Sequence, residues 1–175
     1  DVNQARTKDG ATLVYAAANL GLDDVLSLLG ARGADMHRPR SDGCTPCITA
    51  AAGGRIGALN ILIHAGVNVD VATSDGMTAC YMAAQNGHGD ALGLLIAAEA
   101  DVNRAMPDSG ATPSHIAAQR GHADVISRLI AAGANLNQGN HVGATPAYVA
   151  AHEGHADVVR CLAENGAKLD QADND

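Results

Sequence analysis

Large side chains are scarce in this sequence of 175 residues, which contains no Trp, no Phe and only three Tyr. Alanine and glycine are abundant instead, with 36 and 20 residues, and the chain is 47% hydrophobic. A core built on aromatic side chains is therefore excluded, and we expect closely packed helices rich in small residues. The hydrophobic content and the modest charged fraction of 17% also exclude a wholly disordered chain.

Positive charge is scarce as well, because the net charge is −8 and the isoelectric point is about 5.3. Nucleic-acid binding requires a basic surface, so we expect no nucleic-acid partner. No apolar run approaches the roughly 20 residues of a membrane span, so we expect no membrane insertion. The four cysteines lack the paired spacing of a disulfide framework, which favours an intracellular, cytoplasmic protein.

A repeat of 33 or 34 residues organises the whole chain. It is marked by threonines at Thr12, Thr45, Thr78, Thr112 and Thr145. Each threonine is followed by an alanine after six residues, a glycine after nine and a leucine after seventeen. Four columns of equivalent positions that are filled in all five units exclude coincidence.

Each column predicts a local structure. Threonine, followed by proline in three units, is typical of a helix N-cap with Pro at the first helical position. The glycine ends this short first helix in a left-handed conformation. Apolar spacing in segments such as 124–130 predicts a second helix. A polar stretch with a glycine turn, such as Asp42-Gly43, then predicts a hairpin-like loop that leads into the next unit.

The second helix is expected to end at a glycine in four of the five units: Gly33, Gly66, Gly133 and Gly166. Glu99 occupies this column in the third unit. Because the column calls for a left-handed backbone, we predict that Glu99 adopts this conformation at a cost of about 1 kcal/mol.

The pattern resembles the ankyrin repeat, whose signature is T-P-L-H-x-A. The closest segment is Thr112-Pro113-Ser114-His115-Ile116-Ala117-Ala118. The resemblance implies an all-α solenoid of helix-turn-helix units with projecting β-hairpin-like loops. Smaller or polar residues replace the signature leucine, which predicts a looser core than is usual. They are Val14, Cys47, Cys80, Ser114 and Ala147.

We expect a single ankyrin-repeat domain over residues 1–175. Its repeats are 1–34, 35–67, 68–100, 101–134 and 135–167, with a partial repeat at 168–175. Solenoids normally close with polar terminal repeats. Here the first unit keeps apolar Leu13 and Val14, and the last keeps Val158 and Leu162. We therefore expect a piece of a longer protein, monomeric when isolated.

No motif argues for catalysis, and we expect no catalytic, cofactor or metal site. Cys44 and Cys47 form a single CxxC, which is either a redox motif or structural. The repeat places Cys47 in a core column, so we favour the structural interpretation. The segment His152-Glu153-Gly154-His155 does not have the H-E-x-x-H spacing of zinc proteases.

Two further groups have alternative interpretations. His88, His122 and His155 share one column. Because stacked helices separate equivalent residues by about 8–10 Å, we favour a structural role over metal binding. Asn3 and Asn103 resemble asparagines that are hydroxylated in some ankyrin repeats, but asparagine also suits this turn through its hydrogen bonds.

Recognition is expected on the concave face, formed by loop tips and first helices. The framework columns are constant there while the tip columns differ between units, as in a recognition surface, although neutral drift gives the same pattern. The candidate partner-binding residues are Arg6, Lys8, Arg38, Arg40, Ser74, Met77, Gln85, Asn86, Arg104, Met106, Gln119, Arg120, His141 and His152.

The first functional hypothesis is a non-enzymatic scaffold or adaptor that binds a protein partner on this face. The alternatives are the targeting segment of a larger enzyme, channel or ubiquitin-ligase adaptor, and a structural spacer. Cations gather in the first two units, at Arg6, Lys8, Arg38 and Arg40. They are either a solvated surface or a basic patch that receives an acidic segment of the partner.

Overall fold

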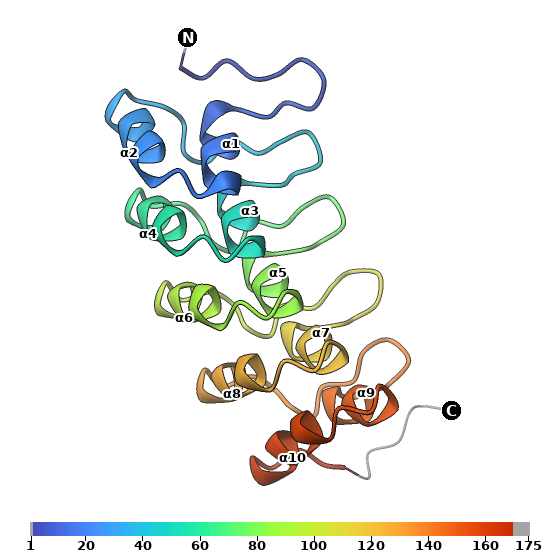
Figure 1. Cartoon of the computed structure of the whole chain (residues 1–175). Helices are drawn as coiled ribbons and strands as arrows, with labels where there is room; N and C mark the ends of the chain where they lie inside the picture. The colour runs from blue at the N-terminus through green and yellow to red at the C-terminus, as the bar shows by residue number, and fades with distance from the viewer. Residues whose placement is uncertain (1, 170–175) are drawn as a thin grey trace.

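Ten α-helices in five pairs form the architecture of the described chain, residues 2–169 of a computed structural model (Figure 1). The pairs are α1 (Leu13–Leu20) with α2 (Asp23–Ala31), α3 (Pro46–Ala52) with α4 (Ile56–His64), α5 (Ala79–Gln85) with α6 (Gly89–Ala97), α7 (Pro113–Gln119) with α8 (Ala123–Ala131), and α9 (Pro146–His152) with α10 (Ala156–Glu164). The partial repeat predicted at 168–175 lies largely outside the described residues.

The pairs stack into an elongated solenoid, as the repeat predicts. Figure 1 shows α1, α3, α5, α7 and α9 in one row, the other helices in a second row, and loops projecting beyond the first row. Each first helix packs against the next first helix, and each second helix against the next second helix. Alanine and leucine columns fill the space between them, so that Ala51, Leu59 and Leu95 are fully buried.

The predicted N-caps are confirmed. The threonine Oγ1 accepts a hydrogen bond from the backbone N–H three residues on in four first helices, for example from Ile48 to Thr45 at 3.2 Å. The glycines after the second helices have positive φ values, and Glu99 has the same conformation with a φ of 62°. The structure therefore confirms the left-handed backbone expected for this glutamate.

The projecting loops are narrow hairpins closed by a backbone hydrogen bond. Arg40 N–H donates to Cys44 O at 2.9 Å, and Thr73 N–H donates to Met77 O at 2.9 Å. Within the part of the chain that the structure describes, the loops contain one isolated antiparallel bridge, between Ala72 and Thr78. The hairpin character is thus present, but the loops are too short to form strands.

Candidate functional site

The loop-side face, formed by the loop tips and the C-terminal ends of the first helices, contains all fourteen predicted binding residues. Four of them are half-buried: Arg40, Met77, Gln85 and Met106. The other ten are exposed: Arg6, Lys8, Arg38, Ser74, Asn86, Arg104, Gln119, Arg120, His141 and His152. The face is thus accessible along all five repeats.

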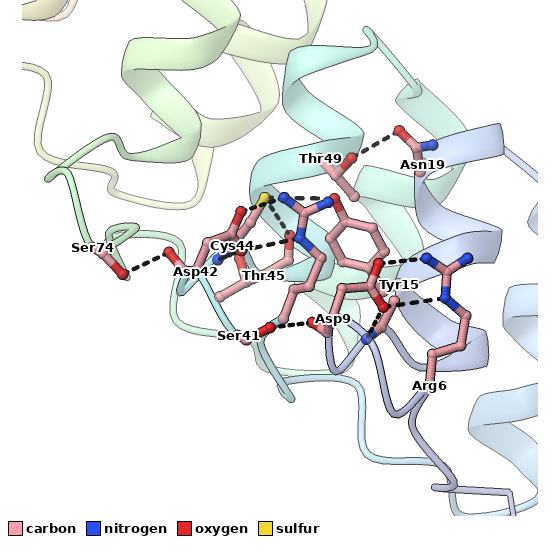
Figure 2. A network of polar contacts seen from close by, with 12 residues as sticks. Arg6, Asp9, Tyr15, Asn19, Ser41, Asp42, Cys44, Thr45, Thr49 and Ser74 are labelled. Atoms are coloured by element: carbon pink, nitrogen blue, oxygen red, sulfur yellow. Dashed lines mark hydrogen bonds and ion pairs between the residues drawn. The ribbon is translucent and has the colours of Figure 1, made fainter.

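Two of the four cations at the first tips are already paired with carboxylates (Figure 2). Arg6 and Arg40 each direct Nε and Nη2 at the two oxygens of a nearby aspartate, Asp9 and Asp42. The hydrogen bonds from Arg40 lower the pKa of Asp42 to about 2. Hence both carboxylates stay ionised, and the guanidinium forks of Arg6 and Arg40 are occupied within the chain.

Arg40 is held further by the first helix. Its guanidinium carbon lies 5.4 Å from the centre of the Tyr15 ring, a distance at which cation–π attraction operates. The Tyr15 hydroxyl lies 3.9 Å from Cys44 Sγ, and burial raises the pKa of this tyrosine. The second tip is therefore anchored on α1.

Lys8 and Arg38 remain the uncompensated cations of this region. Arg38 uses Nη1 to donate to Asn3 O at 3.2 Å, and its other guanidinium N–H groups make no hydrogen bond with the described residues. Neither side chain has a carboxylate within ion-pair distance in residues 2–169. Of the cations in the predicted basic patch, Lys8 and Arg38 are therefore the two that have no carboxylate partner among residues 2–169.

Several predicted binding residues also connect neighbouring loops. Ser74 donates through its hydroxyl to Asp42 O at 2.9 Å, and its backbone N–H bonds the same oxygen (Figure 2). Arg104 Nη1 donates to Asp70 O at 3.0 Å, and His141 N–H donates to Ser109 O at 2.8 Å. These bonds order the tips before any partner binds.

Between the third and fourth loops of the described chain the hydrogen bond from tip to tip is missing, although Arg104 and Asp70 still connect the bases of these loops. Here the described residues include no hydrogen bond from the fourth tip to Asp75 O. The fourth loop is one residue longer, and Pro107 packs so closely on Gly76 that a Cβ at this glycine would lie 2.2 Å from the proline ring. A proline has no N–H to donate. Met77 and Met106 lie in these two loops, where the packing of Pro107 on Gly76 takes the place of the hydrogen bond.

A hollow of about 240 Å³ lies between the fourth and fifth loops. Apolar Ile116 and Val149 and polar Tyr81, Gln119 and Asn140 are among its lining residues. The sequence predicts Gln119 as a binding residue and places Asn140 in a variable tip column. Tyr81, Ile116 and Val149 were missed because they belong to framework columns, where the sequence indicates packing rather than exposure.

The recurring histidines form a structural series. Nε2 of His88, His122 and His155 lies 3.0–3.1 Å from a carbonyl oxygen at the end of the first helix in the preceding repeat. Each ring also covers a glycine of that repeat: a Cβ at Gly121 would lie 2.7 Å from the ring of His155. The structural interpretation is therefore confirmed. Residues 2–169 contain no group of three or more His, Cys, Asp or Glu placed to hold a metal ion.

The cysteines of the described chain belong to the hydrophobic core or pack against it. All four are free thiols. Cys47 and Cys80 are buried, and burial raises the pKa of each to about 12. Burial also raises the pKa of Cys44, the first residue of the CxxC. A reactive thiol requires a lowered pKa, so the geometry agrees with the structural interpretation.

The asparagines of the loop bases connect repeats in the same way as the histidines. Asn3 Oδ1 accepts the backbone N–H of Asp35 at 2.7 Å, and Asn103 Oδ1 accepts that of Asn135 at 2.7 Å. Their side chains thus stabilise the junction between successive loops. Hydroxylation of these residues stays an open prediction.

The fold and these periodic contacts define a class, the helical repeat proteins. A sequence model described as ankyrin repeats (3 copies) matches residues 13–106 and again residues 94–173. The chain belongs to the ankyrin-repeat family. A search of curated protein sequences gives no significant match. Ankyrin repeats are generally protein–protein interaction modules and are typically non-catalytic. No helix among residues 2–169 is long and apolar enough to cross a bilayer.

Proposed function

We propose that this chain is a non-enzymatic interaction module whose loop-side face binds a protein partner. The observation that supports this proposal most is the accessibility of ten of the fourteen candidate side chains, on loops that hydrogen bonds already order and on the ends of the first helices. An ordered surface loses little conformational entropy on binding, which favours affinity. Neither a nucleic acid nor a second copy of the chain is part of this proposal.

Charge supports an acidic segment of the partner as the ligand of the first two tips. Carboxylates are frequent at the start of the second helices, just after the turns that follow the first helices: Asp23, Asp24, Asp90, Asp124 and Asp157. The first two loops instead combine four cations with three described carboxylates, Asp9, Asp35 and Asp42, of which Asp9 and Asp42 are already paired. Lys8 and Arg38 then contact the acidic segment directly, while Arg40 positions the second tip.

Affinity purification from a cell lysate with three baits tests this proposal. They are the wild-type chain, a front variant with Lys8→Glu and Arg38→Glu, and a back variant with Arg32→Glu and Arg160→Glu. The four side chains are exposed, so both variants change surface charge equally. We expect the wild type and the back variant to recover the same partner, and the front variant to lose it.

Salt provides a second criterion. The partner should dissociate as salt rises above 0.1 M, where the Debye length falls below about 10 Å. Equal recovery by the front variant, with circular dichroism showing that it is folded, would contradict the role of Lys8 and Arg38. Recovery of no protein by any bait would favour the structural spacer.

The four free thiols agree with a reducing compartment, and we propose that the module works inside the cell, in the cytoplasm.

A further inference from the structure

The hollow between the fourth and fifth loops combines apolar surface with unused hydrogen-bonding groups. Ile116 and Val149 supply the apolar surface. Asn140 Oδ1 accepts two backbone N–H groups of its own loop, but its Nδ2 makes no hydrogen bond with the described residues. The Tyr81 hydroxyl and the Gln119 amide make none with the described residues either. A few free polar groups beside apolar side chains are typical of a binding site.

The lining of this hollow is uncharged. None of the described residues that line it is Asp, Glu, Lys or Arg, and the buried His115 bonds within the chain through both ring nitrogens. Tyr15, the counterpart of Tyr81 two repeats earlier, instead lies 5.4 Å from the guanidinium of Arg40. The residue whose N–H closes the hairpin in the same way in the fourth loop is the neutral Met106.

The tips of the last two loops also lack a carboxylate that the first three tips share. The position three residues before the repeat threonine is occupied, in order, by Asp9, Asp42, Asp75, Ser109 and Val142. Ser109 lines the hollow, and Val142 is 62% exposed. A charged group that entered this region would lose water without gaining an ionic partner. The surroundings therefore favour a neutral, apolar ligand.

The size of the hollow limits what can occupy it. Pockets for small molecules usually enclose about 300–1,000 Å³. This hollow encloses about 240 Å³, which suits a single side chain better than a whole small molecule. The free amide groups of Gln119 and Asn140 can bond the main chain that carries such a side chain, because amides donate to peptide carbonyls.

We propose that the hollow receives one apolar side chain of an extended segment of the partner, and that Gln119 and Asn140 hydrogen-bond the main chain of this segment. The same segment carries the acidic residues that contact Lys8 and Arg38, so the inference rests on the proposed function and specifies its ligand.

The solenoid sets the spacing between the two parts of this ligand. The hollow lies about two and a half repeats beyond the second loop, and at about 8–10 Å per repeat this distance is about 20–25 Å. An extended chain spans about 3.3–3.6 Å per residue, so about six to eight residues separate the acidic part from the apolar side chain.

A displayed library of random peptides, each about twelve residues long, supplies the probe, and the whole chain is the target. We expect enriched peptides to carry an apolar residue about six to eight positions from acidic residues. Gln119→Trp, which fills the hollow from an exposed position, should weaken binding of such a peptide about tenfold or more in fluorescence anisotropy. Ser127→Trp, which replaces another neutral and exposed residue on α8, should leave the affinity unchanged.

The peptide provides a matched control. Replacing its apolar residue by serine should weaken binding to the wild-type chain to a similar extent. The same replacement should cost the Gln119→Trp variant nothing further, because both changes remove one contact.

Equal affinity of the wild type and a folded Gln119→Trp variant would overturn the inference. If the front variant with Lys8→Glu and Arg38→Glu still loses the peptide, the proposed function stands without it. No enrichment of peptides, or equal affinity of both variants and the wild type, would contradict both. Self-association of the wild type in sedimentation experiments, reversed by Gln119→Trp, would also overturn the inference, because a second copy of the chain would then occupy the hollow.

Discussion

Glu99 is the one non-glycine residue with a positive φ in the described chain, at 62°. At the equivalent Gly33, Gly66 and Gly133, an added Cβ would meet no atom within 4 Å, so the cost at this column is conformational. Glu99→Gly should raise the free energy of unfolding by up to about 1 kcal/mol, although the more flexible unfolded chain offsets part of the gain. Urea denaturation measures the change. Glu99→Ala is the control and should give no such gain, because alanine keeps the Cβ; a less stable glycine variant would contradict the assigned register.

We also expect the buried His115 to make the free energy of unfolding depend on pH. Its Nε2–H donates to Ala144 O at 2.9 Å, so neutral Nδ1 accepts from the N–H and the hydroxyl of Thr112, at 3.1 and 2.8 Å. Burial lowers the pKa of His115 from its usual 6.5. The stabilisation that the neutral imidazole of His115 gives to the folded state is therefore fully present above pH 6.5. It is lost as the pH falls through the lower pKa of the folded state.

His115→Gln should lower the free energy of unfolding by about 1–3 kcal/mol at pH 7. Its deficit relative to the wild type should shrink as the pH falls below 6.5, in thermal unfolding followed by circular dichroism. His141→Gln, at an exposed loop tip, serves as the control. A deficit that is constant with pH would show that His115 acts through packing alone.

At the scale of elements, each helix pair is stabilised by its neighbours. Leu95 and Leu162 occupy one column and both are 0% exposed, but α6 lies between two helix pairs while α10 belongs to the last described pair. Leu95→Ala should cost about 2–5 kcal/mol through the cavity it leaves. Leu162→Ala should cost less, because the last pair can fray alone. Equal losses in urea denaturation would contradict the stacked account.

The helices and their ends could be predicted from the sequence because the interactions that define them are local. The threonine cap, the helix-ending glycines and the alanine columns each act within one unit, so their period predicts the stack. The ion pairs Arg6–Asp9 and Arg40–Asp42 were not predicted, since they depend on the loop conformation. The effect of Pro107 on Gly76 was also missed, because it joins loops 31 residues apart in sequence and the one-residue insertion obscures the register.

At the scale of the whole molecule, the loop-side face and the second helices present different surfaces. The loop tips carry exposed, unlike side chains, and the second helices begin with aspartates in four of five pairs. A partner that binds the loops therefore leaves the second row of helices free. Because the loops and the second helices are different segments of the chain, hydrogen exchange can show which of them a partner contacts without a structure of the complex.

The central claim is tested most directly by hydrogen exchange of the whole chain with and without the partner recovered by the wild-type bait. We expect slower exchange in the loops at residues 2–12 and 35–45 and at the ends of the first helices, with unchanged exchange in α2, α4, α6, α8 and α10. Protection confined to the second helices, with the loops unchanged, would contradict recognition on the loop-side face.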